Sequence, residues 1–243
     1  MTARWCWMTI PLLACAALAA AADQPAPRFD ATRLKTGIFT YRDSVDGKPG
    51  SPSTSTIVRL PDGHYRFTAD FPAFDQSWST VATRAMGPVE TTLKMRLHDG
   101  QHYLMTLKYS GLHVSGEADT AASGDGRLPA TQAPVSGELT ADTVDQRIDW
   151  ATVMTTDRKP GESFGFQVYD AKTGVSRVSC AVSDAGMMDT PLGAVRAIKL
   201  QYIVYKASGT EVYTVYTSEG FPRLMLREDL PGGLVTTLVA VKP

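Results

Sequence analysis

The feature that most constrains the fold is the alternation of apolar and polar residues along short segments. From Leu34 onward such segments follow one another, separated by turn-forming pairs such as Asp62-Gly63 and Asp99-Gly100. A period of two is typical of β-strands that bury one face, whereas amphipathic helices repeat every ~3.6 residues. The sequence therefore predicts a mainly β protein, a single domain over residues 34–243, in which antiparallel strands are joined by tight turns.

Two of the predicted hairpins indicate which side chains share a face. Around Pro61-Asp62-Gly63-His64, a four-residue loop places Val58 and Leu60 on the same face as Tyr65 and Phe67. A turn at residues 207–210 pairs Val204 with Tyr213 and Tyr202 with Val215. The candidate apolar wall of a ligand site is this set: Tyr202, Val204, Tyr213 and Val215.

A third hairpin turns at Asp99-Gly100-Gln101, because only a loop of this length gives one wholly apolar face. The predicted pairs are Leu97 with Tyr103, Met95 with Met105 and Leu93 with Leu107. In this register His98 and His102 lie opposite each other on the polar face. Two imidazoles lack the further ligands that zinc usually takes, so we expect neither a metal site nor a cofactor here.

Two segments depart from the strand pattern. Residues 115–138 are rich in small and polar residues, which predicts a mobile loop. Directly after them, Thr143-Val144-Asp145-Gln146 fits a capping box, and Val144, Ile148 and Ala151 share one helical face. One helix is therefore expected from about Thr143 to Thr155.

The N-terminus has the pattern of an export signal. Arg4 is the only charge before an apolar run that ends near Leu18, and Ala20-Ala21-Ala22 follows it. This pattern predicts a signal peptide over residues 1–22, a mature chain that begins at Asp23, and a tether over residues 23–33. The run is shorter than the ~20 residues of a membrane-spanning helix and contains a proline, so we expect a periplasmic protein that does not span the membrane.

A second cleavage site competes with the first. Leu12-Leu13-Ala14-Cys15 resembles a lipobox, in which Cys15 would become the lipid-anchored first residue. Apolar residues continue beyond Cys15, whereas a lipobox normally ends the apolar stretch. Ordinary cleavage at residue 22 is therefore favoured, with lipid anchoring as the alternative.

Charge and cysteine content exclude several classes of function. The formal net charge is −1, so the chain lacks the basic excess that binds nucleic acid. After cleavage Cys180 is the one cysteine well inside the mature chain, so no disulfide framework is expected. Carboxylates such as Asp43, Glu228 and Asp229 are interpreted as turn residues.

One string resembles the nucleophile motif of serine hydrolases. Gly161-Glu162-Ser163-Phe164-Gly165 has the G-x-S-x-G spacing, but that motif requires a strand before the serine and a helix after it. Here a loop precedes Ser163 and a strand is expected to follow. The sequence therefore favours a protein that is not an enzyme, with a hydrolase that uses Ser163 as an alternative.

In the C-terminal third, Thr190-Pro191-Leu192-Gly193 forms a predicted turn that precedes a strand ending in Lys199-Leu200. In these residues the chain resembles an uncharacterised family of exported bacterial proteins, known as domain of unknown function thirty-one-oh-eight. Further matching segments are Ile148-Asp149-Trp150, Pro160-Gly161-Glu162, Val215-Tyr216-Thr217-Ser218, Phe221-Pro222-Arg223-Leu224 and Thr236-Thr237-Leu238-Val239. The resemblance implies a twisted antiparallel sheet that curls around a helix, similar to the lipoprotein carriers of the envelope, and it implies no catalytic residues.

These patterns lead to one expected fold and function. We expect an antiparallel half-barrel or barrel wrapped around a single α-helix. Apolar residues crowd both faces of the predicted hairpin at residues 200–216, so one face needs a cover such as a bound apolar molecule. The expected function is non-enzymatic binding of a lipid-like or other apolar envelope molecule, or of an envelope protein. A scaffolding protein without a ligand is the alternative.

Overall fold

The computed structural model describes residues 29–122 and 127–242, and it is dominated by strands. They are β1 (Gly37–Val45), β2 (Lys48–Arg59), β3 (Tyr65–Phe71), β4 (Gln76–Ala82), β5 (Pro88–Arg96), β6 (His102–Ser110), β7 (His113–Thr120), β8 (Thr131–Glu138), β9 (Thr143–Asp145), β10 (Ser163–Asp170), β11 (Gly174–Thr190), β12 (Gly193–Lys206), β13 (Gly209–Ser218), β14 (Met225–Asp229) and β15 (Leu234–Lys242). The predicted mainly β class is confirmed.

All of these strands belong to one sheet of 15 strands, which runs in the order β8-β7-β6-β5-β4-β3-β2-β1-β15-β14-β13-β12-β11-β10-β9. Neighbouring strands are antiparallel except β9 and β10, which are parallel. The first strand pairs with the last, so the two ends of the domain meet in the middle of the sheet. Because β8 and β9 remain separate edges of the described sheet, the sheet is not closed, and of the predicted forms, half-barrel or barrel, the closed barrel is excluded.

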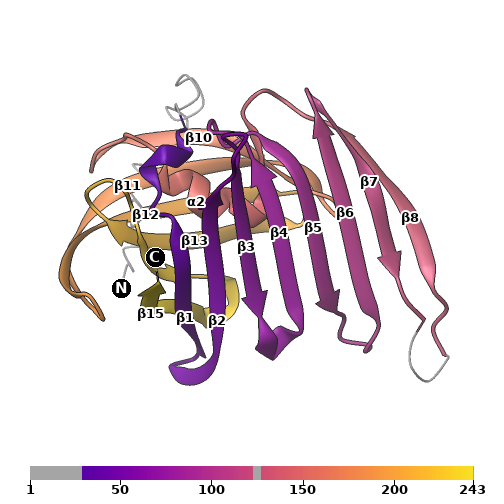
Figure 1. Ribbon diagram of the computed structural model, residues 1–243, viewed down its shortest axis with the longest axis horizontal. Coiled ribbons are helices and arrows are strands. Elements are labelled where there is room, and N and C mark those ends of the chain that lie inside the picture. Colours follow the sequence, from indigo (N-terminus) through magenta and orange to yellow (C-terminus); the bar gives the residue numbers. More distant parts are fainter. Residues whose placement is uncertain (1–28, 123–126, 243) are drawn as a thin grey trace, which may run out of the picture.

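The sheet has two halves with helical turns between them. Strands β1–β8 form one half, and β10–β13 run across behind them, with α2 (Asp149–Met154) in between (Figure 1). The 3-10 turn η4 (Gln146–Ile148) contacts β4 and β10, while α2 contacts β9 and β13. All six residues of α2 are buried. None of the helices in the described part of the chain is long and apolar enough to cross a membrane.

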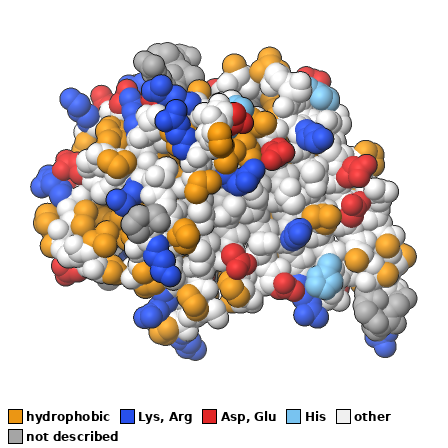
Figure 2. All heavy atoms as spheres, in the orientation of Figure 1, with side chains coloured by type: hydrophobic (Ala, Val, Ile, Leu, Met, Phe, Trp, Pro, Cys, Tyr) orange, Lys and Arg blue, Asp and Glu red, His pale blue; other side chains and the backbone are white. Residues whose placement is uncertain are grey.

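The inner faces of the two halves carry the core. Its largest fully buried side chains include Phe39, Phe67, Met105, Phe164 and Phe166. The outer face of β1–β8 is different, because charged and uncharged polar side chains are interspersed on it with few hydrophobic ones (Figure 2). This distribution is the one that a period of two produces when only one face of a sheet is buried.

The helix is shorter than predicted. Only Asp149–Met154 is α-helical, and Thr143–Asp145 forms β9 instead. The reason is that the edge of β10 offers unpaired backbone groups, and Thr143–Asp145 pairs with it. The side chain of Asp145 then accepts a hydrogen bond from the backbone of Arg147, so the capping residue is Asp145.

The loop predicted over residues 115–138 was also wrong for most of its length. Strands β7 and β8 occupy this segment and pair with each other over eight residues, while residues 123–126 lie outside the described part. Composition misled because an edge hairpin is held by backbone hydrogen bonds and needs few large side chains. Small residues even have a packing role, since a Cβ at Gly116 would lie 2.0 Å from the Thr106 carbonyl oxygen on β6.

The predicted tether over residues 23–33 is packed where it is described. Phe29 is buried, and its ring centroid lies 5.5 Å from that of Phe166. The amide of Ala31 donates to the carbonyl of Arg84 over 2.8 Å, at the start of the 3-10 turn η2 (Ala31–Arg33). The first strand begins at Gly37, later than Leu34. The predicted signal peptide, Cys15 and residues 23–28 lie outside the described residues.

The hairpin registers differ from the predictions in an informative way. At Gly63 the loop has three residues, so Ile57 and not Val58 pairs with Phe67, and Val58 is 38% exposed. The other two hairpins shift by two residues, which preserves their buried faces. Met95 pairs with Tyr103, and Tyr202 pairs with Tyr213. Alternation alone specifies a face but cannot distinguish registers that differ by two.

The assignment of residues 115–138 to strands is testable at Gly116. We expect Gly116→Ala to lower the free energy of unfolding by about 1–3 kcal/mol, because the added methyl group meets the backbone of β6. The neighbouring exposed residue provides the control, since Ser115→Ala should change stability by less than about 0.5 kcal/mol. Urea denaturation measures both values, and hydrogen exchange at residues 113–120 should accelerate only in Gly116→Ala. Equal behaviour of the two variants would contradict the pairing of β6 with β7.

Candidate functional site

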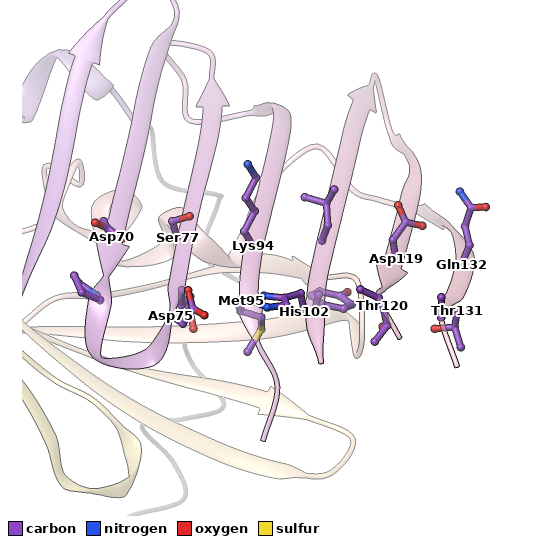
Figure 3. Close-up of a pocket in the computed structure, with 16 residues that line it drawn as sticks. Asp70, Asp75, Ser77, Lys94, Met95, His102, Asp119, Thr120, Thr131 and Gln132 are labelled. Atoms are coloured by element: carbon purple, nitrogen blue, oxygen red, sulfur yellow. The ribbon is translucent and has the colours of Figure 1, made fainter. Parts of the chain in front are cut away.

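The described part of the chain has hollows of about 1000, 790 and 640 Å³, which are all large enough for a small molecule. One is an open groove of about 1000 Å³ at the ends of β3–β8, where Asp70, Ser77, Lys94 and Asp119 lie in a row along neighbouring strands (Figure 3). The hollow of about 790 Å³ is also open to solvent, and it is lined by residues from both halves of the sheet and by the turns between them. We take the second, called here the interior cavity, as the candidate site because buried ionisable groups converge on it.

Aromatic side chains form much of the wall of the interior cavity. From the first half of the sheet come Tyr41, Phe71 and Trp78, and the helix contributes Trp150. Leu93, Met225, Leu230 and Leu234 add aliphatic surface. The wall is thus assembled from segments far apart in the sequence.

The apolar wall predicted from the sequence lies partly at this cavity. Tyr202 and Tyr213 line it, and their rings are stacked with centroids 5.0 Å apart and an interplanar angle of 7°. Val204 and Val215 share the inner face but are fully buried in the core and do not line the cavity. On the opposite face Val212 is 46% exposed, so the described chain does not completely cover that face.

Asp149 is the first of two acidic residues inside the cavity wall. Asp149 is only 5% exposed. Its Oδ1 accepts hydrogen bonds from the Trp150 amide (2.6 Å) and the Tyr202 hydroxyl (3.2 Å). Burial raises the pKa of this carboxyl to about 7, although both hydrogen bonds oppose the shift. Near neutral pH the group therefore populates its protonated and ionised forms.

Glu228 is the second acidic residue, and its side chain is half-buried at the cavity wall. It stands opposite Thr236 on β15 and Val215 on β13, and it lines the cavity. Within the described residues its carboxylate has no hydrogen-bond or ion-pair partner. Burial raises its pKa to about 8, and the negative charges of Asp149, Asp229 and Asp43 add to the shift.

The cations at the cavity are engaged with other acids. Arg147 Nη2 lies 2.7 Å from Asp170 Oδ2, and Lys206 Nζ lies 2.7 Å from Glu211 Oε2. Lys172, the remaining cation of the lining, is exposed. Asp43 accepts hydrogen bonds from Ser53 and Thr236, so its charge is held by hydroxyl groups and not by a cation.

The other sequence candidates do not assemble into a site. Ser163 opens β10 opposite Ala181, and the helix required by a nucleophile elbow does not follow it. His102 pairs with Arg96, while His98 lies in the turn, so these histidines are not opposite each other. No group of metal-binding residues occurs in the described part of the chain. Cys180 is fully buried, which raises the pKa of its thiol.

The interpretation of Asp43, Glu228 and Asp229 as turn residues was wrong, and it concealed the acidic part of the site. Asp43 lies in β1, and the other two lie in β14. A partial signal was present, because Asp149 falls within the apolar segment Ile148–Met154, where an acid is unusual. Nothing comparable marked Glu228, whose inward direction follows from pairing with distant strands.

Comparisons with known proteins do not add an identity. No known family matches the chain, and no curated protein or solved structure matches it. The resemblance to the family of exported bacterial proteins stays a prediction based on the segments quoted above. What is known of the site is therefore its geometry and its electrostatics.

Proposed function

We propose that this protein binds an amphipathic, lipid-like molecule in the interior cavity and that it is not an enzyme. In this proposal the sheet acts as a half-barrel around η4 and α2, and it works in the periplasm after export. The observation that carries the proposal is the hollow of about 790 Å³ between two sheet halves whose inner faces otherwise form a packed core.

The dimensions and walls of the cavity suit such a ligand. Small-molecule sites are typically about 300–1,000 Å³ and are lined mainly by apolar and aromatic groups with a few polar ones. Trp78, Trp150 and the stacked pair Tyr202–Tyr213 offer broad apolar surfaces for an alkyl chain. The acids and hydroxyls of β1, β14 and β15 provide a polar end for a head group. A purely scaffolding protein would gain stability by filling this volume.

Binding can be tested with a cavity-filling substitution and with the same substitution at a neighbouring residue on the outer face as a control. Ser55 lines the cavity on β2, and its neighbour Thr56 points to the other side of the sheet. We expect Ser55→Phe to weaken binding of a dansyl-labelled twelve-carbon fatty acid at least about tenfold, and Thr56→Phe to bind it as the wild type does. Fluorescence titration measures the affinities, and native mass spectrometry of protein from its own envelope identifies a bound molecule.

Urea denaturation would show whether Ser55→Phe remains folded. If it does not, Leu234→Trp is a second filling variant at the less buried end of the cavity. Saturable binding that both filling variants retain would place the ligand elsewhere. Unliganded protein together with no saturable binding would overturn the proposal in favour of scaffolding.

The raised pKa of Glu228 predicts that the free energy of unfolding depends on pH. As pH rises from about 4.5 to 8, unfolded Glu228 ionises while the folded residue keeps its proton, so the wild type loses stability over this range. We expect Glu228→Gln to match the wild type at pH 4 and to be more stable by on the order of 3 kcal/mol at pH 9. Urea denaturation across this pH range measures the difference.

The control for this experiment is an exposed acid. Glu90 is exposed on β5, so Glu90→Gln should leave the pH dependence of stability unchanged. A stability difference between Glu228→Gln and the wild type that stays constant from pH 4 to pH 9 would contradict the burial of an unpaired acid at this position.

A further inference from the structure

We infer that the polar end of the interior cavity recognises an organic cation, so that the preferred ligand is an alkyl chain with a positively charged ammonium head. This inference rests on the proposed function, because it names the chemistry of the ligand for the same cavity. It stands on the arrangement of Glu228, Asp149 and the surrounding aromatic rings.

The first argument is the imbalance of charge at this end. Glu228 is faced by Tyr41 and Asp43 from β1, Asp149 from α2, Tyr202 from β12 and Tyr213 from β13, and Asp229 neighbours it on β14. None of these groups is a cation, and Arg227, the other neighbour of Glu228 on β14, forms an ion pair with Asp229. Neither Asp149, which accepts two hydrogen bonds, nor the half-buried Glu228 forms an ion pair within the described residues, so a ligand cation could supply the counter-charge at this wall.

The cations Arg147 and Lys206 at the cavity form their ion pairs with other acids, not with Asp149 or Glu228. Asp149 has Asp145 and Arg147 as further charged neighbours. Arg147 forms an ion pair with Asp170, with 2.7 Å between Nη2 and Oδ2. Its Nη1 also lies 3.6 Å from Asp145 Oδ1. Lys206 forms an ion pair with Glu211. A ligand cation would therefore meet carboxylates that no side-chain cation already occupies.

The third argument is the nature of the surrounding surface. Tyr41, Tyr202, Tyr213, Trp78 and Trp150 all line the cavity that contains the two acids. The face of an aromatic ring attracts cations, and aromatic walls combined with carboxylates are a typical environment for ammonium groups. An anionic head would instead be repelled by any of the acids Asp149, Glu228 and Asp43 that is ionised.

Binding of a cation at this place has a consequence for protons. A positive charge beside Glu228 and Asp149 favours their ionised forms, so the acids release protons when the ligand binds. The pKa of Glu228 is about 8 and that of Asp149 about 7 without the ligand. Affinity for a cation that does not titrate should therefore rise with pH between 6 and 9.

The test compares three twelve-carbon probes below their micellar concentrations. They are dodecyltrimethylammonium, neutral tetraethylene glycol dodecyl ether and dodecanoate. At pH 8 we expect the ammonium to bind at least about tenfold more tightly than the other two. Its affinity should rise at least about tenfold from pH 6 to pH 9, and calorimetry at pH 7 in two buffers of different ionisation enthalpy should detect released protons.

Variants connect this selectivity to the acids. Glu228→Gln should lose about tenfold in affinity for the ammonium and much of the pH dependence, while keeping the affinity for the neutral ether. Asp149→Asn should act in the same direction, and Glu90→Gln, on the outer face, should match the wild type. The neutral ether also serves as a measure of folding and of cavity access in every variant.

The outcomes separate the inference from the proposed function. Equal affinity for all three probes, or a preference for dodecanoate, would overturn the cation inference and leave lipid-like binding intact. Tight ammonium binding that Glu228→Gln and Asp149→Asn do not weaken would also overturn it. Failure of all three probes to bind would overturn both proposals.

Discussion

One buried side chain joins the segments on which the cavity depends. Arg223 is 5% exposed, and its Nη1 donates to the carbonyls of Met154 (3.0 Å) and Thr156 (2.9 Å) at the end of α2. Its backbone pairs with the N-terminal segment, since its amide donates to the Arg33 carbonyl and its carbonyl accepts from the Lys35 amide. Burial lowers the pKa of Arg223 only to about 10, so it stays charged at neutral pH. The last carbonyls of a helix need donors, and here Arg223 and Arg33, whose Nη1 donates to the Thr155 carbonyl over 2.8 Å, supply them.

The position of α2 then determines what remains between the sheet halves. The helix spans only Asp149–Met154, so it fills part of the interior, and the aromatic walls around the rest enclose a hollow. Asp149 lies in the first turn of this helix, and Glu228 faces the hollow from β14. An unpaired acid in such a place lowers stability, and structures retain such groups mainly where a ligand or a reaction uses them.

The sequence predicted the parts of the fold that depend on local pattern. Period-two alternation correctly predicted the β class and the shared inner face of Tyr202 and Tyr213. It did not determine register, because a shift by two residues preserves every face, and it did not reveal β7 and β8, whose small residues pair through their backbones. The helix was overextended because the edge of β10 captured Thr143–Asp145.

The site was harder to predict than the fold because it exists only after distant strands pair. Tyr202 and Tyr213 were accessible from one hairpin, but Glu228 faces Asp149 across the interior from a strand whose direction depends on β13 and β15. Composition and short motifs carry no information about which distant residues, such as Glu228 and Asp149, come close together in the fold. The string around Ser163 shows the converse, since its spacing matches a known motif while its structural context does not.

Asp149 and Glu228 line the interior cavity, and neither carboxyl group forms an ion pair within the described residues. Carbon-13 NMR of the side-chain carboxyls measures this most directly, because it follows the titration of each acid in the folded protein. The account predicts midpoints near pH 7 for Asp149 and near pH 8 for Glu228. Midpoints near the ordinary values of 3.8 and 4.5 would mean that water or a cation already solvates both groups, and that result would contradict the account.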